Sequence, residues 1–163
     1  MAKGIRKIVG RLQNSEVTIR NATIADLLGM TTLLGELFTI ESDFTPDVRR
    51  QREGLAQLMG SKDATLLVAV EKKKIVGMCT LQPLISTAEG GTVGMVEDLV
   101  VSEKWRGRGI GGMLLDRIEE IANAQQISRL QLLTDLDNEQ ALEFYNKHQW
   151  ERLNLIGMRK KFS

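Results

Sequence analysis

The sequence predicts an α/β fold in which one central mixed sheet is flanked by about four helices. Strand-like and helix-like segments interleave along the chain, and no internal repeat or low-complexity segment interrupts them. The 163 residues, of which 42% are hydrophobic and 26% charged, suffice for a single core. We therefore expect one domain over residues 16–163. Residues 1–15 form a basic N-terminal extension, and its role, as a flexible tail or a partner-binding arm, is left open.

The first part of the chain is predicted to form a strand and two helices. Residues 17–20 alternate as a strand does, and Thr23 and Asp26 have the spacing of a capping box. Thr45 and Pro46 predict the start of a second helix, which Gly60 ends, with a loop over residues 40–44 before it. The apolar positions expected to face the core are Ile24, Leu27, Leu28, Leu34, Leu37 and Phe38, then Val48, Leu55, Leu58 and Met59.

The middle of the chain is predicted to form a hairpin and a further strand. Residues 65–70 and 75–81 read as strands around a charged turn at residues 71–74. Pro83 is expected to stop regular pairing soon afterwards. A glycine-containing loop over residues 86–92 then leads into a strand at 93–101.

The last part of the chain is predicted to alternate again. A helix follows a glycine-rich turn, then come a strand at 129–133, a helix at 139–148 and a final strand or pair of strands at 151–161. Asn138 is a candidate N-cap for the helix at 139–148. The apolar face of the helix after the glycine-rich turn would comprise Ile110, Met113, Leu114, Ile118 and Ile121.

The glycine-rich turn, WRGRGIGG at residues 105–112, predicts a polyphosphate site. Glycine lets the backbone approach an anion, and the first amides of a helix and its dipole favour negative charge there. Arg106 and Arg108 add full charges with forked donors. A surface turn without a ligand is the less favoured interpretation. Glycine loses more conformational entropy on folding than any other residue, and such a turn would offer no binding interaction to offset that loss.

Two common phosphate motifs fit this turn poorly. A P-loop needs Gly-Lys-Ser/Thr, whereas Met113 follows Gly112 here. The letters of the dinucleotide fingerprint are present, but residues 102–106 separate them from the preceding strand. The acidic residue expected about 20 residues later is also missing, since Arg129 and Gln131 occupy that zone. A dinucleotide-dependent enzyme therefore stays a distant alternative.

Two motifs resemble those of the GNAT superfamily of N-acetyltransferases. Arg106-x-x-Gly109-x-Gly111 resembles the superfamily's Arg/Gln-x-x-Gly-x-Gly/Ala pattern, which holds the pyrophosphate of coenzyme A. Asn138, followed seven residues later by Tyr145, resembles its second signature. The resemblance covers roughly residues 16 to 162, and the order of elements is the same. It implies a GNAT-like acyl-CoA N-acyltransferase fold with acetyl-CoA as co-substrate.

The resemblance also implies which residues bind the co-substrate. The main chain of Leu99, Val100 and Val101 would pair with the pantetheine arm. Asn138 would cap its helix, contact the co-substrate, or both. The residues implied for the pyrophosphate are Arg106, Gly107, Arg108, Gly109, Ile110, Gly111 and Gly112.

Acetyl transfer to an amine needs a base for the amine and an acid for the departing thiolate. By resemblance, the acid would be Tyr145, the only tyrosine. Its reference pKa of about 10 lies above that of a thiol, about 8.5, so the tyrosine is protonated at neutral pH and has a proton to donate as the thiolate departs. Packing beside Phe144 is the alternative role for this tyrosine. Glu97 and Asp98 are the candidate bases. Successive strand residues face opposite ways, so only one is expected in the cleft, and we favour Glu97.

One departure from the superfamily concerns the end of the tyrosine helix. The superfamily usually has Gly-Phe there, whereas this chain has Gln149 and Trp150. Glutamine in a left-handed cap conformation would be strained. We therefore expect either a different helix end or a shifted wall near Trp150.

The acceptor is expected to be a small-molecule or peptide amine. In the superfamily it is bound by the first two helices, their loop and the last strands, which here implies Phe38, Glu41, Asp43 and Phe44. Small amines, amino sugars and protein amines all stay open, as does a homodimer. The alternative function is a non-catalytic acetyl-CoA-binding sensor or interaction module on the same fold.

The sequence argues against a nucleic-acid-binding, membrane-spanning, disulfide-bonded or metal-binding protein. The formal net charge of +1 does not predict a broad basic surface for nucleic acid. No apolar segment predicts a membrane helix. The single cysteine, Cys79, excludes an internal disulfide, favours a cytoplasmic location and is expected to pack in the core. His148, the only histidine, is expected to serve the helix dipole or solvent, and no ligand cluster predicts a metal.

Overall fold

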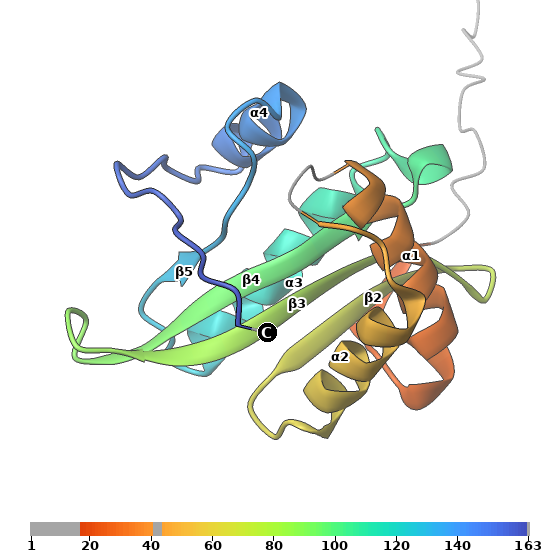
Figure 1. Cartoon of the computed structure of the whole chain (residues 1–163), viewed down its shortest axis with the longest axis horizontal. Helices are drawn as coiled ribbons and strands as arrows, with labels where there is room; N and C mark the ends of the chain where they lie inside the picture. The colour runs from red at the N-terminus through yellow and green to blue at the C-terminus, as the bar shows by residue number, and fades with distance from the viewer. Residues whose placement is uncertain (1–16, 41–43, 163) are drawn as a thin grey trace, which may run out of the picture.

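The computed structural model describes residues 17–40 and 44–162, which form a five-stranded sheet in the order β1-β2-β3-β4-β5 with helices on both faces (Figure 1). Neighbouring strands are antiparallel except β4 and β5, which are parallel. The strands are β1 (Thr18–Asn21), β2 (Thr65–Glu71), β3 (Lys74–Ser86), β4 (Gly91–Val101) and β5 (Leu130–Gln131). The helices are α1 (Leu27–Ile40), α2 (Val48–Gly60), α3 (Ile110–Ala124) and α4 (Glu139–Lys147), with short 3-10 turns η1 (Ile24–Asp26) and η2 (Glu103–Trp105). The predicted mixed α/β sheet is confirmed.

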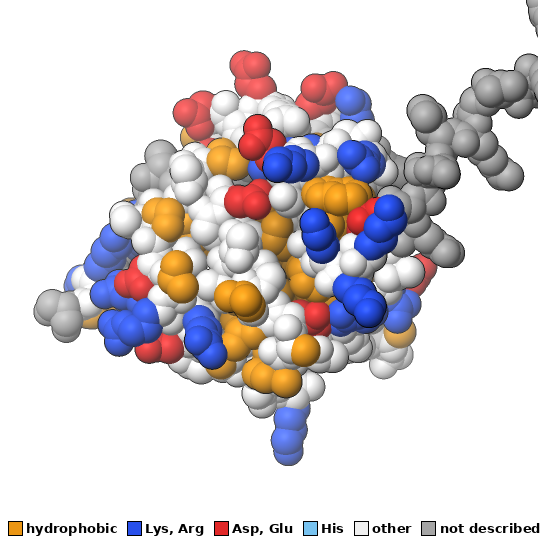
Figure 2. Space-filling model, turned by 90° about the vertical axis from the view of Figure 1, so that its right-hand side faces the viewer, with side chains coloured by type: hydrophobic (Ala, Val, Ile, Leu, Met, Phe, Trp, Pro, Cys, Tyr) orange, Lys and Arg blue, Asp and Glu red, His pale blue; other side chains and the backbone are white. Residues whose placement is uncertain are grey.

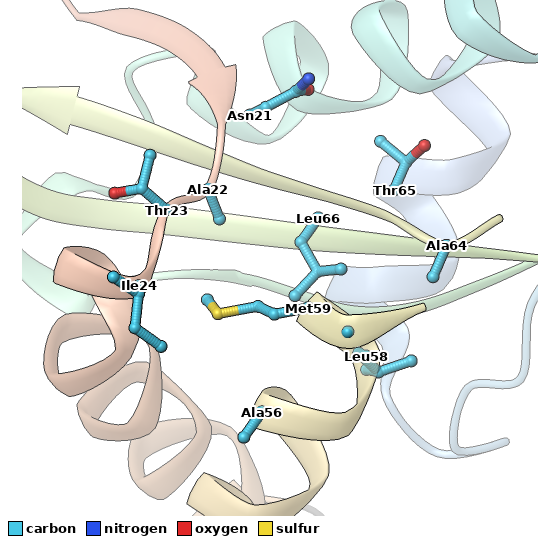
Figure 3. A pocket seen from close by; sticks show the side chains of 11 residues that line it. Asn21, Ala22, Thr23, Ile24, Ala56, Leu58, Met59, Ala64, Thr65 and Leu66 are labelled. Atoms are coloured by element: carbon cyan, nitrogen blue, oxygen red, sulfur yellow. The ribbon is translucent and has the colours of Figure 1, made fainter. Parts of the chain in front are cut away.

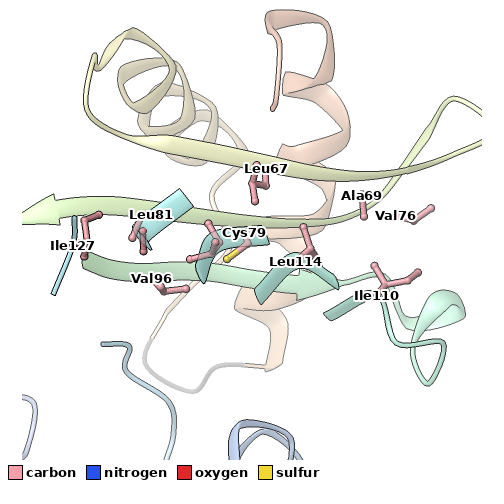
Figure 4. Close-up of a cluster of buried hydrophobic side chains, with 11 residues drawn as sticks. Leu67, Ala69, Val76, Cys79, Leu81, Val96, Ile110, Leu114 and Ile127 are labelled. Carbon is pink, nitrogen blue, oxygen red and sulfur yellow. The ribbon is translucent and has the colours of Figure 1, made fainter. Parts of the chain in front are cut away.

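The core has two layers, one on each face of the sheet. Helix α3 packs on one face, where Leu114 lies in one buried cluster with Leu67 and Leu81 (Figure 4). Ile118 belongs to the same cluster. Helices α1 and α2 cover the other face, and buried side chains such as Leu55 contribute to a second cluster there. Each layer therefore has its own set of apolar contacts, and the sheet stands between them.

The charged turn between β2 and β3 takes the predicted hairpin form. Lys72 and Lys73 both have positive φ, 44° and 69°, which gives the two-residue connection whose twist suits a hairpin. On the face shown in Figure 2, basic and acidic side chains are interspersed with scattered apolar ones. Within residues 17–40 and 44–162, no helix is long and apolar enough to cross a membrane.

Some predictions for the first two helices were wrong. Helix α2 begins at Val48 with Asp47 as its N-cap, whose carboxylate accepts from the Arg50 amide, and not at Thr45 and Pro46. Ile24, Leu28 and Val48 were expected in the core but are 73%, 81% and 67% exposed. Met30 and Leu33 occupy the buried face of α1 instead. Residues 41–43, most of the predicted loop, lie outside the described residues, as does the extension at 1–15.

Pro83 does not end β3, contrary to the prediction. The strand continues to Ser86 and pairs with β4, with Pro83 opposite Gly94. The pairing of β2 with β3 begins at Leu81, so beyond this point β4 is the only strand neighbour of β3 in the described part of the chain. A proline without an N–H donor is tolerated where a strand is paired on one side.

The C-terminal half also departs from the prediction in places. Strand β5 comprises only residues 130–131 of the predicted 129–133, and residues 151–162 are exposed and form no strand. Because β5 meets β4 only at Gly94 and Met95, it offers a very short edge for further pairing. In α3 the buried face includes Leu115, while Met113 is 39% exposed.

Candidate active site

The turn between β4 and α3 has the conformation that a phosphate site requires. Gly107 and Gly109 have φ of 72° and 78°, in the left-handed region where a side chain is strained. Gly109 caps α3, and its carbonyl accepts the first helical hydrogen bond, from Met113 N at 3.1 Å. The amides of residues 110–112 precede that bond, so they point out of the positive end of the helix. The turn thus has N–H donors of the kind that can bind an anion at a helix N-terminus.

Two arginines stand beside these amides. Arg106 Nε donates to the Val101 carbonyl at 2.9 Å, which ties the guanidinium to the end of β4. The Arg108 guanidinium lies 4.5 Å from the centre of the Trp105 ring and donates to the Lys104 carbonyl. Both arginines are exposed, and neither forms an ion pair with a described residue. Their charge is therefore available to an anionic ligand.

Helix α4 rests on the same turn. A Cβ on Gly111 would lie 3.1 Å from the Phe144 ring, and one on Gly112 would lie 2.8 Å from His148 Nε2. The last two glycines of the turn thus let the aromatic side chains of α4 pack close to its backbone. His148 does not project into solvent: its Nε2 is buried without a hydrogen-bond partner among the described residues.

Tyr145 lies on α4 between two aromatic neighbours. Its ring centre is 5.3 Å from that of Phe144 and 5.9 Å from that of Trp150, and the tyrosine is half-buried. Asn138 caps the helix as predicted, since its side-chain oxygen accepts from the Ala141 amide at 3.1 Å. The N-terminus of α3 and the helix that carries Tyr145 therefore form one packed unit.

The end of α4 explains how Gln149 replaces a glycine. Gln149 has a φ of 64°, and Trp150 N donates back to the Tyr145 carbonyl at 3.0 Å. This is the hydrogen-bond pattern of a left-handed helix cap with a non-glycine residue in it. The expectation of a different helix end is therefore wrong: the left-handed cap forms with glutamine in it, and Trp150 packs against the core on the α3 side.

A β-bulge interrupts β4 at the two candidate bases. Thr80 pairs with Glu97 and Met78 with Val100, so β4 has one residue more than β3 in this interval. Asp98 takes the left-handed conformation, with a φ of 53°. The bulge resets the alternation: Leu99 packs toward α3 and Val100 toward α1 and α2.

Glu97 is held at both its main chain and its side chain. Gln82 Nε2 donates to the Glu97 carboxylate at 2.9 Å. The buried hydroxyl of Thr80 donates to the Glu97 carbonyl at 3.1 Å. Sequence reasoning missed Gln82 and Thr80, although strand pairing of residues 75–81 with 93–101, extended through Pro83, would have placed them beside Glu97.

Cys79 faces the α3 side of the sheet and is fully buried. Burial raises the pKa of its thiol, and the nearby Asp98 carboxylate raises it further. A thiol held protonated is a poor nucleophile, so the predicted packing role is confirmed. Among the described residues, no group of three or more His, Cys, Asp and Glu side chains could hold a metal ion.

The expected acceptor residues are described in part. The rings of Phe38 and Phe44 lie 5.3 Å apart, and the Arg159 guanidinium lies 5.5 Å from the Phe44 ring. Arg159 of the C-terminal segment thus lies beside Phe44, whose ring in turn contacts Phe38 near the end of α1. Glu41 and Asp43 lie outside the described residues.

Comparison with known proteins agrees with this geometry. Residues 30–150 match the acetyltransferase (GNAT) family. The chain is 28% identical over 127 residues to the aminoalkylphosphonate N-acetyltransferase of Salmonella typhimurium, an alignment that covers 78% of this chain and 80% of the relative.

Solved structures share the fold over most of the chain. A transcriptional regulator from Bacillus halodurans superposes with a TM-score of 0.77 at 26% identity, covering 90% of this chain and all of its own (100%). An aminoglycoside acetyltransferase from a soil metagenome, in complex with sisomicin, gives a TM-score of 0.75 at 20% identity, with coverage of 90% and 97%. The latter likeness concerns the fold alone.

Proposed function

The chain belongs to the acetyltransferase (GNAT) family, and we propose that it transfers the acetyl group of acetyl-CoA directly to an amine bound in the same complex. The acceptor would be a small-molecule amine, as the names of the Salmonella relative and the sisomicin complex suggest. In this mechanism the amine nitrogen attacks the thioester carbonyl, the C–N bond forms and the C–S bond breaks. The chain must hold the donor, take a proton from the amine and return one to the thiolate.

The observation that carries the proposal is the turn at residues 106–112. Its left-handed glycines, its open amides and two arginines that form no ion pair with a described residue together suit the diphosphate of coenzyme A. Leu99, Val100 and Val101 would hold the pantetheine arm with their main chain. This role is supported by the short β4–β5 pairing, because beyond Met95 the outer edge of β4 has no strand partner among the described residues.

Glu97 is the base in this proposal. Its carboxylate is exposed, and its position is fixed by Gln82 and by the main-chain contact of Thr80. Asp98 remains the alternative base. Its carboxylate lies near Cys79, which is buried in the α3 layer on the sheet face opposite α1 and α2, so Asp98 is the less favoured candidate. An alkyl amine with a pKa near 10 must lose a proton before it attacks, and a fixed carboxylate can take it directly or through water.

Tyr145 is the general acid in this proposal, and Asn138 fixes the start of its helix. The contacts of Phe144 and His148 with the glycines of the turn support this role, because they set α4 against the site proposed for the donor. The hydroxyl would donate its proton to the thiolate as the C–S bond breaks.

Two measurements test the proposal. Calorimetric titration with acetyl-CoA should show binding to the wild type, about 5-fold weaker binding to Arg106→Met and unchanged binding to Arg52→Met, an exposed arginine of α2. Release of coenzyme A thiol across an amine panel should then show turnover. Binding without thiol release would indicate a sensor in place of an enzyme, and equal affinity of Arg106→Met would refute the phosphate assignment.

A further inference from the structure

A pocket of about 280 Å³ opens at the C-terminal end of α2, on the sheet face opposite α3. Its lining includes Leu58, Asp63, Ala64, Gln82 and Pro83. Gln82 also donates its amide to the Glu97 carboxylate at 2.9 Å. One side chain therefore connects this pocket to the carboxylate proposed as the base.

The polar groups around the pocket are negative or neutral. Among the residues that the structure describes, no lysine or arginine lines it, and the Asp63 carboxylate has no ion pair or hydrogen bond with any of them. The carbonyls of Gln57 and Leu58, at the negative end of α2, also lie at this wall, where both accept from Ser61 N at 3.1 Å. The pocket therefore favours a cation and disfavours an anion.

A larger pocket of about 510 Å³ lies on the other side of Leu58 and Ala64 (Figure 3). Within residues 17–40 and 44–162, no charged residue lines it, and the side chain of Met59 extends into it between Ile24 and Leu66. None of its lining residues contacts Glu97 by a hydrogen bond. The smaller pocket is thus the one connected to the proposed chemistry.

We infer that the smaller pocket receives the far end of the acceptor, and that the acceptor is a small diamine or polyamine. This inference rests on the proposed function. One amine would face Glu97 and the acetyl donor, while the second, as an ammonium, would face Asp63 and the end of α2. The reacting amine gives its proton to Glu97 and gains the acetyl carbon, and the thiolate takes a proton from Tyr145. An acceptor with a phosphonate at its far end would instead place that anion against Asp63.

The test compares amines of similar length that differ at the far end: putrescine, butylamine, γ-aminobutyrate and aminopropylphosphonate. The readout is kcat/KM from thiol release. Putrescine should be the best acceptor. Asp63→Asn should lower its kcat/KM about 3- to 10-fold and leave that of butylamine unchanged, because the variant removes one exposed charge. Asp116→Asn, an exposed change on α3, is the matched control and should alter neither.

Several outcomes would overturn the inference. Equal use of putrescine and butylamine, a preference for the phosphonate, or an Asp63→Asn variant with unchanged selectivity would each remove the cation site, while thiol release with any amine would retain the proposed function. No thiol release with any amine would refute both. Thermal unfolding of Asp63→Asn confirms that a loss of selectivity comes from a folded protein.

Discussion

Gln82 on β3 donates its side-chain amide to the Glu97 carboxylate on β4, with 2.9 Å between Nε2 and Oε2. This contact leaves the second carboxylate oxygen to face an amine. It spans two strands whose pairing continues through Pro83 to the tip of the hairpin. The orientation of the proposed base is therefore a property of the β3–β4 ladder.

Gln82→Leu should lower kcat about 2- to 10-fold, because a carboxylate without this hydrogen bond samples other rotamers. The KM for acetyl-CoA should stay constant, since Gln82 lies away from the β4–α3 turn. Steady-state kinetics with a fixed amine checks both values. Gln125→Leu, at the exposed end of α3, serves as the control, and a kcat equal to that of the wild type in Gln82→Leu would show that Glu97 needs no such support.

Tyr145→Phe should lower kcat by about 10²–10⁴ while acetyl-CoA affinity stays nearly constant, as expected for the loss of a general acid. The ring is retained, so its packing with Phe144 and Trp150 is preserved. Single-turnover kinetics and calorimetry measure the two quantities. Unchanged turnover would leave Tyr145 with a packing role only.

Gly109→Ala should weaken acetyl-CoA binding and lower the free energy of unfolding by about 1–2 kcal/mol, because Gly109 has a φ of 78°. Gly54→Ala is a matched control: a Cβ there meets nothing within 4 Å, in the middle of α2. It should raise stability by about 0.5–1 kcal/mol and leave binding intact. Urea unfolding and calorimetry distinguish the two glycines, and equal effects would mean that the turn conformation is unimportant.

Asp26 should make stability depend on pH in the acid range. Its carboxylate accepts two hydrogen bonds from Arg20, at 2.7 and 2.8 Å, and further ones from Thr23, which lower its pKa from 3.8 to about 2. A lowered folded-state pKa means that the stabilisation is complete above pH 3.8 and is lost as the pH falls through 2.

Asp26→Asn should therefore cost about 1–2 kcal/mol at neutral pH, a range that allows for screening of the 43% exposed Arg20. The difference from the wild type should shrink toward pH 2. Urea unfolding at several pH values measures it, and a cost independent of pH would exclude the ion pair as its cause.

Gln126→Gly should raise the free energy of unfolding by about 0.5–1 kcal/mol. Gln126 follows α3 with a φ of 57°, and Ile127 N closes the cap on the Ala122 carbonyl at 2.9 Å. Glycine relieves that strain. The neighbouring Gln125 has a φ of −91°, so Gln125→Gly should be neutral or destabilising. Chemical denaturation of the pair tests the effect, and the same sign for both would contradict it.

Local chemistry explains which features could be predicted from the sequence. Glycines at 107 and 109 are needed because of positive φ, so their residue type alone indicates the turn. Asn138 caps α4 through a contact only three residues away. Thr45-Pro46 failed as a helix start because Asp47, nearer to the amide of Arg50, supplies the cap.

Features that depend on pairing between strands could not be predicted in this way. The bulge at Asp98 arises from the register of β3 against β4, and no glycine indicates it. Whether Pro83 breaks a strand depends on where β2 begins, far away in the sequence. The contact between Gln82 and Glu97 likewise depends on this register, which local sequence patterns do not specify.

The separation of the two packed layers has an evolutionary consequence. The amides and arginines proposed for the donor lie where α3 and α4 meet, whereas the pocket beside Asp63 belongs to the end of α2 and to β3. Substitutions near Asp63 alone could thus change which amine acceptor is used by descendants of this chain. Recognition of the nucleotide carrier would be inherited intact.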